Sequence, residues 1–198
     1  VEPLALIGGV RVSDYKVELT NNSNGVKGTR DDNGKLTPYA GLVLDVDRHH
    51  ALYASYSKVF NPQTEYDINN DLIEPRDGTQ YEAGIKGSYF NGDLNARASL
   101  FRMYDRNFAA GVPGENYNEA IGRRRIQGVE LELDGSPLEQ LDIIAGYTYL
   151  DTEVERGADE ATFVLMPDHQ FSLWTKYAFD SGLLDRASIG AGVTAFSD

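Results

Sequence analysis

Cysteine is absent from this chain of 198 residues, and long hydrophobic runs are absent too. Without cysteine, disulfide scaffolds and thiolate metal sites are excluded. No stretch approaches the roughly 20 apolar residues of a spanning helix, so helical membrane proteins are also excluded. Basic residues are few, because 18 Lys and Arg stand against 31 Asp and Glu, for a net charge of −13. This balance argues against a nucleic-acid partner, since phosphate binding requires clustered Lys and Arg.

Motifs of catalysis and metal binding are missing as well. The sequence has no nucleophile elbow, no phosphate-cradling glycine loop and no HExxH motif. His49 and His50 are adjacent in a short turn, where their side chains diverge, and His169 is remote in sequence. The acidic segment 65–77 lacks the regular spacing of a calcium loop. We therefore expect no enzyme, no resident cofactor and no metal site.

What the chain does have is period-two alternation, most clearly in residues 34–63. Even positions from Leu36 to Val46 are apolar, and the pattern resumes from Ala51 to Phe60 after a polar turn. About 11–12 residues rising about 3.3 Å each, tilted by about 45°, cover roughly 27 Å of height. That height matches the hydrocarbon core of a bilayer, whereas sandwich strands usually have about 5–6 residues.

The same alternation continues along the chain and predicts about nine strands. The polar parity of the clearest hairpin carries Glu82, Lys86 and Arg97, while the apolar parity between residues 79 and 100 carries no charge. Long polar loops are predicted at 20–34, 61–77, 105–121 and 152–168, and short turns at 47–50, Asn91-Gly92, Ser136-Pro137 and 180–182. Long loops at one end and short turns at the other are typical of outer-membrane barrels.

Charges on the apolar parity support this placement. Arg102, Arg123 and Arg125 are exceptions to it, and all three lie toward the long-loop end. There a lipid-facing charge costs about 0–1 kcal/mol, against about 2–4 kcal/mol at the midplane. Tyrosines near the predicted strand ends fit an aromatic girdle, although strand propensity alone would also explain them.

Four segments resemble the barrel of TonB-dependent ferric-siderophore receptors. They are residues 34–63, YEAGIKGSYFNGDLNARASLFRMYDRN at 81–107, GVELELDGSPLEQLDIIAGYTYLDTE at 128–153 and PDHQFSLWTKY at 167–177. The resemblance implies an all-β, antiparallel, up-and-down transmembrane barrel in the bacterial outer membrane. It also implies a ferric siderophore as ligand, an N-terminal plug domain, and a TonB energy-coupling complex that acts through this plug.

The chain departs from the family pattern in several features. No plug domain, N-terminal energy-coupling box or aromatic C-terminal strand is found in residues 1–198. The sequence from Val1 has no basic n-region and apolar h-region of a signal peptide, so we expect either that a signal peptide was cleaved or that the chain begins inside a longer protein. About nine strands cannot close a barrel of about 22 strands. We therefore interpret residues 1–198 as part of a C-terminal barrel domain that lacks the plug and the final strands.

Candidate ligand-binding residues follow from the chemistry of the implied ligand. A ferric siderophore is a bulky, oxygen-rich chelate, so its site needs aromatic surfaces and donors at the extracellular mouth, facing the lumen. The candidates are Phe60, Tyr66, Arg106, Tyr117, Arg124 and Phe163. Loop packing or contact with lipopolysaccharide is an alternative role for each of them.

Two other functions remain open at this point. One is a soluble β-sandwich adhesin or sugar-binding domain, which would have shorter strands packed in two layers. The other is a passive porin, which would keep the barrel without a plug.

Overall fold

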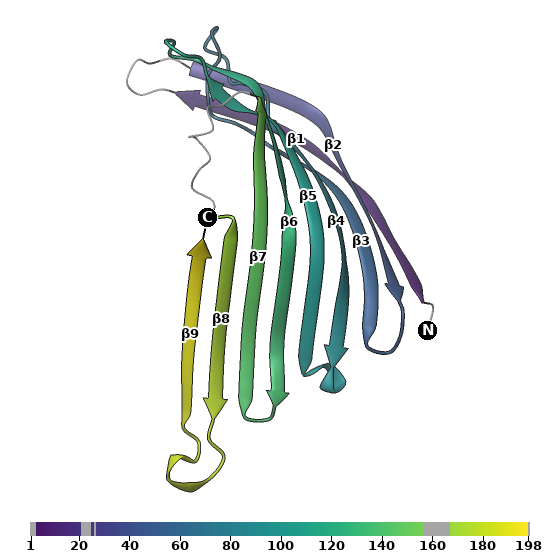
Figure 1. Cartoon of the computed structure of the whole chain (residues 1–198). Helices are drawn as coiled ribbons and strands as arrows, with labels where there is room; N and C mark the ends of the chain where they lie inside the picture. Colours follow the sequence, from purple (N-terminus) through teal and green to yellow (C-terminus); the bar gives the residue numbers. More distant parts are fainter. Residues whose placement is uncertain (1–2, 21–24, 26, 157–166, 198) are drawn as a thin grey trace.

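The chain forms one open sheet of nine strands. The computed structural model describes residues 3–20, 25, 27–156 and 167–197. Within these residues each strand pairs antiparallel with the next in sequence order, and the sheet curves like part of a barrel wall (Figure 1). The strands are β1 (Leu4–Thr20), β2 (Lys27–Asp45), β3 (His50–Asn61), β4 (Arg76–Tyr89), β5 (Leu94–Gly111), β6 (Asn118–Leu138), β7 (Leu141–Arg156), β8 (His169–Ala178) and β9 (Ser188–Ser197). The predicted all-β, up-and-down topology of about nine strands is confirmed.

No second layer covers this sheet in the described part of the chain. The single sheet excludes the β-sandwich alternative, because a sandwich needs two packed sheets. The strands also have 10 to 21 residues, longer than sandwich strands. No helix among the described residues has the length and apolar character needed to cross a membrane.

The register places apolar side chains in continuous rows on one face, called here the apolar face. One such row crosses seven strands through directly opposed partners: Leu6, Leu42, Ala54, Ala83, Leu100, Val129 and Tyr149. Leu6 and Leu100 are 76% and 64% exposed, because nothing in the described chain packs against them. Exposed apolar area on this scale requires a nonaqueous partner, and lipid is the partner that the strand lengths fit.

The opposite, polar face carries a network of ion pairs across β4, β5 and β6. Arg97 contacts Glu132 at 2.6 Å, Glu130 at 3.5 Å and Glu82 at 3.7 Å. Tyr53 donates a hydrogen bond to Glu82, and Lys86 lies over the Tyr53 ring. These contacts connect β3, β4, β5 and β6, so they hold the register of the wall.

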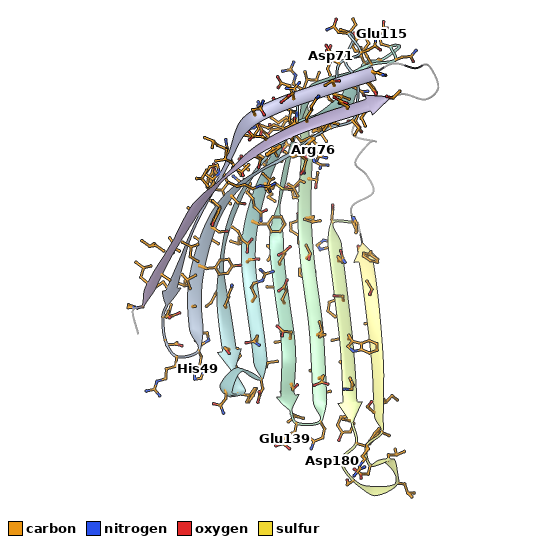
Figure 2. The ribbon with its side chains drawn as sticks, turned by 180° about the vertical axis from the view of Figure 1, so that it is seen from behind. His49, Asp71, Arg76, Glu115, Glu139 and Asp180 are labelled. Carbon is orange, nitrogen blue, oxygen red and sulfur yellow. The ribbon has the colours of Figure 1, made fainter. Side chains whose placement is uncertain are left out.

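The two ends of the sheet differ as predicted. Short connections lie at the end marked by His49, Glu139 and Asp180, while Asp71 and Glu115 lie together at the other end (Figure 2). We call these the turn end and the loop end. At one turn Asn91 and Gly92 have φ of 60° and 104°, the positive values that the Asn-Gly pair indicated.

Several predicted boundaries are wrong at the loop end. The segment expected to form a loop at 20–34 belongs largely to β2, which begins at Lys27, and Gly28 in it is buried. The expected loop at 105–121 is reduced to 112–117, because β5 extends to Gly111 and β6 begins at Asn118. Backbone pairing continues beyond the apolar band, where no lipid-facing side requires alternation.

The predicted position of one turn is also wrong. The chain does not reverse at Ser136-Pro137, because β6 continues to Leu138 and β7 begins at Leu141. The register shifts between Gly135 and Leu138, so the Ser-Pro pair lies in an irregular end of the strand. A bulge of this kind accommodates a proline that cannot donate to the ladder.

Candidate functional site at the loop end

The buried core of the described chain lies at the loop end. Residues 62–75, called here the folded loop, turn back on themselves through a β-bridge between Tyr66 and Leu72. Leu72 and Ile73 are only 2% and 5% exposed. On the β2 side, Gly28 lies against the Tyr66 ring so closely that an added Cβ would be 2.4 Å from it. Apolar burial therefore gives this connection a defined structure, unlike a solvated loop.

Gln63 connects the folded loop to β5. Its Nε2 donates to the carbonyl oxygens of Glu74 and Asn107, and its Oε1 accepts a hydrogen bond from the Ala109 amide at 2.9 Å. The residue is 8% exposed. On the other side of the loop, the Asn118 amide donates to the Tyr66 carbonyl at 2.8 Å. A buried amide with its hydrogen-bonding groups satisfied fixes the loop against the extended ends of β5 and β6.

Asp105 joins two arginines from the neighbouring strands. It is 5% exposed, and it accepts hydrogen bonds from Arg76 and, at 2.8 Å, from Arg124. The Arg124 guanidinium also lies 5.8 Å from the centre of the Phe108 ring. Asn107 has a positive φ of 59° where the register shifts, and this bulge brings Phe108 opposite Gly122. Cations and an aromatic surface are thus assembled at one place.

A second polar group lies on the extensions of β1 and β2. The Tyr15 hydroxyl donates to Asp32, and Arg30 donates to the same carboxylate at 2.7 Å. Burial, and then the bond to the Asp32 carboxylate, raises the pKa of Tyr15 to about 12. The hydrogen bond from Arg30 lowers the pKa of Asp32. Arg30 also donates to the Leu72 carbonyl at 3.4 Å, so this group contacts the folded loop.

The structure brings together some of the candidate residues and separates others. Tyr66 and Arg124 lie in the loop-end core, and Tyr117 immediately precedes the Asn118 amide that bonds to Tyr66. Phe60, the penultimate residue of β3, is the register partner of Asp77 and shares the parity of the apolar face, with its ring 5.6 Å from that of Tyr15. Phe60 and Arg106 are both placed differently from the expected lumen-facing position.

Arg106 shares the parity of the apolar face. Its register partner on β4 is Asp77, which continues the row of outward residues Tyr81 and Thr79, and its guanidinium lies over the Tyr104 ring. The neighbouring residue, Asp105, has the opposite parity and lies on the polar face. Phe163 lies outside the described residues.

Comparison with known proteins identifies the chain. Residues 1–197 match the family described as TonB dependent receptor-like, beta-barrel. The chain belongs to this family of TonB-dependent receptors. A curated relative, the ferric-pyoverdine M114 receptor PbuA of a Pseudomonas species, is 36% identical over 98% of the chain and 25% of its own length. The ferripyoverdine receptor of Pseudomonas aeruginosa is 34% identical over 96% of the chain and 24% of its own length.

Solved structures of this family superpose on the whole sheet. The alcaligin outer-membrane receptor FauA of Bordetella pertussis gives a TM-score of 0.80 at 32% identity, over 100% of the chain and 35% of the receptor. The Pseudomonas aeruginosa receptor bound to ferripyoverdine gives 0.81 at 32% identity, over 98% and 26%. The chain spans about a quarter of the length of the curated relatives that it matches.

Membership places the chain in a family of outer-membrane receptors. TonB-dependent receptors are outer-membrane proteins and are not enzymes. Within the ranges that the structure describes, no three His, Asp or Glu residues form a group that could hold a metal ion. His50 instead bonds to Asp47 and to the Tyr89 hydroxyl, each at 3.0 Å, and His49 bonds to the Ser88 carbonyl.

Sequence reasoning missed the residues that organise this site in the receptor. They are Gln63, Arg76, Asp105 and Phe108. Asp105 and Phe108 lay in a segment predicted to be a loop, so no strand parity was assigned to them. Every second residue of β5 after Arg97 lies on the polar face, and extending this alternation to Asp105 predicts its position there. No sequence signal indicates Gln63, because its partners are backbone groups.

Proposed function

We propose that this chain forms part of the wall and external mouth of an outer-membrane receptor that imports a ferric siderophore with TonB-coupled energy. The observation that carries the proposal is the match of the whole sheet, at 32% identity, to a receptor whose solved structure is bound to ferripyoverdine. Residues 1–198 are part of the barrel domain in this proposal. The iron is cargo held by the chelate, and the chain supplies no resident cofactor.

The loop-end cluster supports the proposal because it offers the chemistry that an iron chelate requires. Arg124 and Arg76 supply guanidinium donors for chelate oxygens, and Tyr66 supplies an aromatic ring. Phe108 is only 5% exposed and packs beneath the Arg124 guanidinium. The hydrogen bonds of Gln63 and Asp105 fix these groups before a ligand arrives. Preorganised donors bind with a smaller entropic cost than flexible ones.

The two faces suggest the remaining partners. The polar face, with three carboxylates around Arg97, would face the plug domain through which the TonB complex acts. The apolar face would contact outer-membrane lipid and lipopolysaccharide. No nucleic-acid partner is expected for a chain with a net charge of −13.

Binding of a ferric chelate to the full-length parent receptor tests the proposal. Outer membranes that contain the receptor would be titrated with iron-55-labelled ferripyoverdine and with ferric alcaligin. We expect Tyr66→Ala to weaken the binding of the cognate chelate by about tenfold, the loss expected for one well-packed aromatic contact.

Matched controls separate a lost contact from a lost fold. Tyr177→Ala, at the turn end of β8, should leave the affinity unchanged, and Tyr66→Phe should retain most of it. Unchanged affinity in Tyr66→Ala would remove this site. If neither these chelates nor other iron chelates bind the parent receptor, the proposed function itself is wrong.

A further inference from the structure

The polar face changes in character between β6 and β7. On β4, β5 and β6 it carries the ion pairs around Arg97. On β7, β8 and β9 the same face carries uncharged side chains, from the register partner of Arg124 toward the turn end. They are Val154, Thr152, Leu150, Thr148, Gly146 and Ile144 on β7, Gln170, Ser172 and Trp174 on β8, and Gly192, Thr194 and Phe196 on β9. We call this set of residues the uncharged sector.

Two apolar side chains of the uncharged sector face water rather than lipid. Ile144 and Trp174 are register partners, and they are 60% and 48% exposed. A Cβ added at Gly190 or Gly192 would lie 2.8 or 2.7 Å from the Trp174 ring. The indole therefore lies along the wall over both glycines. It presents a flat apolar surface without projecting into the bore.

The surface beside the indole is hollowed and has only neutral hydrogen-bonding groups. A hollow of about 230 Å³ is lined by Ile144, Ser172, Trp174, Gly192 and Thr194. Hydroxyl groups and an indole can contact an oxygen-rich chelate, but no ionised group of the sector can hold it. Conduction requires contacts that are weak enough to release the solute at each step. The sector meets this requirement, whereas the guanidiniums of the loop end offer stronger, charge-assisted bonds.

The neighbouring part of the polar face has the opposite property. Glu130 and Glu132 contact Arg97, yet their side chains remain 34% and 52% exposed, so both can accept further bonds. Charge-assisted bonds are roughly twice as strong as neutral ones. A protein segment in the bore should therefore be held more firmly by β4, β5 and β6 than by β7, β8 and β9.

We infer that the uncharged sector is the side of the bore along which the ferric chelate passes when the plug domain moves. The inference rests on the proposed function, which places a chelate at the loop end and a plug in the bore. The sector begins at Val154, opposite Arg124, and continues to Ile144 near the turn end, where the pair of Asp142 and Lys176 follows. It thus connects the proposed binding site with the other side of the membrane.

Separate measurements of binding and import test this passage. Bacteria that produce the full-length parent receptor would be given iron-55-labelled ferripyoverdine or ferric alcaligin, with and without an active TonB complex. Ser172→Trp fills the hollow, so we expect it to lower the import rate by about tenfold or more and to leave the affinity unchanged. Leu173→Trp, with the same added side chain on the apolar face, is the matched control and should leave both unchanged.

Thiol labelling gives a second readout, because residues 1–198 contain no cysteine. A membrane-impermeant maleimide would be added to receptors with Ser172→Cys or Ser55→Cys. Ser55 lies on the polar face of β3, opposite Glu82. During TonB-dependent import, labelling at position 172 should accelerate by about threefold or more, because the passage opens there. Labelling at position 55 should change little.

The other outcomes overturn the passage. Normal import by Ser172→Trp would show that the chelate does not cross the sector. Loss of affinity together with import would make position 172 part of the binding site. Equal acceleration at positions 55 and 172 would show an opening that is not confined to the sector, and constant labelling at position 172 would indicate a plug segment that stays on it. A parent receptor that binds no ferric chelate would instead contradict the proposed function.

Discussion

At the residue scale, the loop-end site depends on one buried carboxylate. Asp105 is 5% exposed and accepts hydrogen bonds from Arg76 and Arg124, whose side chains are 36% and 15% exposed. Removing a central carboxylate leaves cations desolvated without their partner, which costs more than the pair contributes when intact. The position is therefore intolerant of a neutral residue even if ligand never contacts it.

We expect Asp105→Ala to destabilise the loop end by about 2 to 3 kcal/mol. Hydrogen exchange of the parent receptor should then show faster exchange of the β5 amides from 105 to 111. Asp77→Ala, an exposed aspartate on β4 without an ion pair in the described chain, should change little. Equal protection in both variants would show that Asp105 does not organise the site.

The Tyr15 hydroxyl predicts a pH dependence. Its pKa is raised to about 12, so the neutral phenol is the form that the fold favours. Its contribution to stability should be complete below pH about 10, the ordinary value, and should be lost as pH rises through about 12. The difference in tyrosinate absorbance between the parent receptor and Tyr15→Phe should titrate near pH 12. Tyr39→Phe serves as a matched tyrosine control on β2, and a Tyr15 difference that titrates near pH 10 would contradict the prediction.

At the element scale, the folded loop is held by side-chain bonds to backbone as well as by burial. Gln63→Ala removes two donated hydrogen bonds and one accepted bond of a buried residue. We expect the loop to detach from β5, and limited proteolysis of residues 62–75 to accelerate by about tenfold or more, since each lost bond contributes about 1 kcal/mol. Gln140→Ala, at the turn end, provides the control. Unchanged cleavage would mean that apolar burial of Leu72 and Ile73 suffices.

The bulge in β5 supplies a second test at this scale. Asn107 has a φ of 59°, a conformation that β-branched residues avoid at a cost of about 1–2 kcal/mol. Asn107→Val should therefore lower the stability of the loop end, and Asn107→Gly should not. Hydrogen exchange at Phe108 and Ala109 would distinguish the two variants. If both are tolerated equally, the bulge is not required for the position of Phe108.

At the scale of the whole molecule, the nine-stranded sheet presents a wide apolar face and two edge strands, β1 and β9. Exposed edges and apolar surface favour association in water. Residues 1–198 expressed alone should therefore form aggregates in detergent-free buffer. They should disperse when detergent is added, as measured by size-exclusion chromatography with light scattering. A stable monomer in buffer would contradict the assignment of the apolar face to lipid.

The sequence determined much of the wall by itself. Alternation at every second residue specified which face each side chain takes, and the charge-free parities located the lipid band. This worked for Glu82, Arg97 and Glu130 because two different solvents act on the two sides of each strand. Where that contrast ends, the sequence signal ends too. The extension of β2 is polar on both parities, and that of β5 combines polar and apolar residues without a steady alternation, so the sequence predicts loops at both.

Tertiary structure decided the arrangement of the loop end. Gln63 bonds to backbone groups, Asp105 is buried by two arginines from neighbouring strands, and the Asn107 bulge reverses the parity that places Phe108. Arg106 was expected to face the lumen, but it lies on the outward parity one residue from Asp105. Face preference is local to a strand and can be read from alternation. The contacts that assemble a site join strands and a loop, so they depend on register and chain reversal in three dimensions.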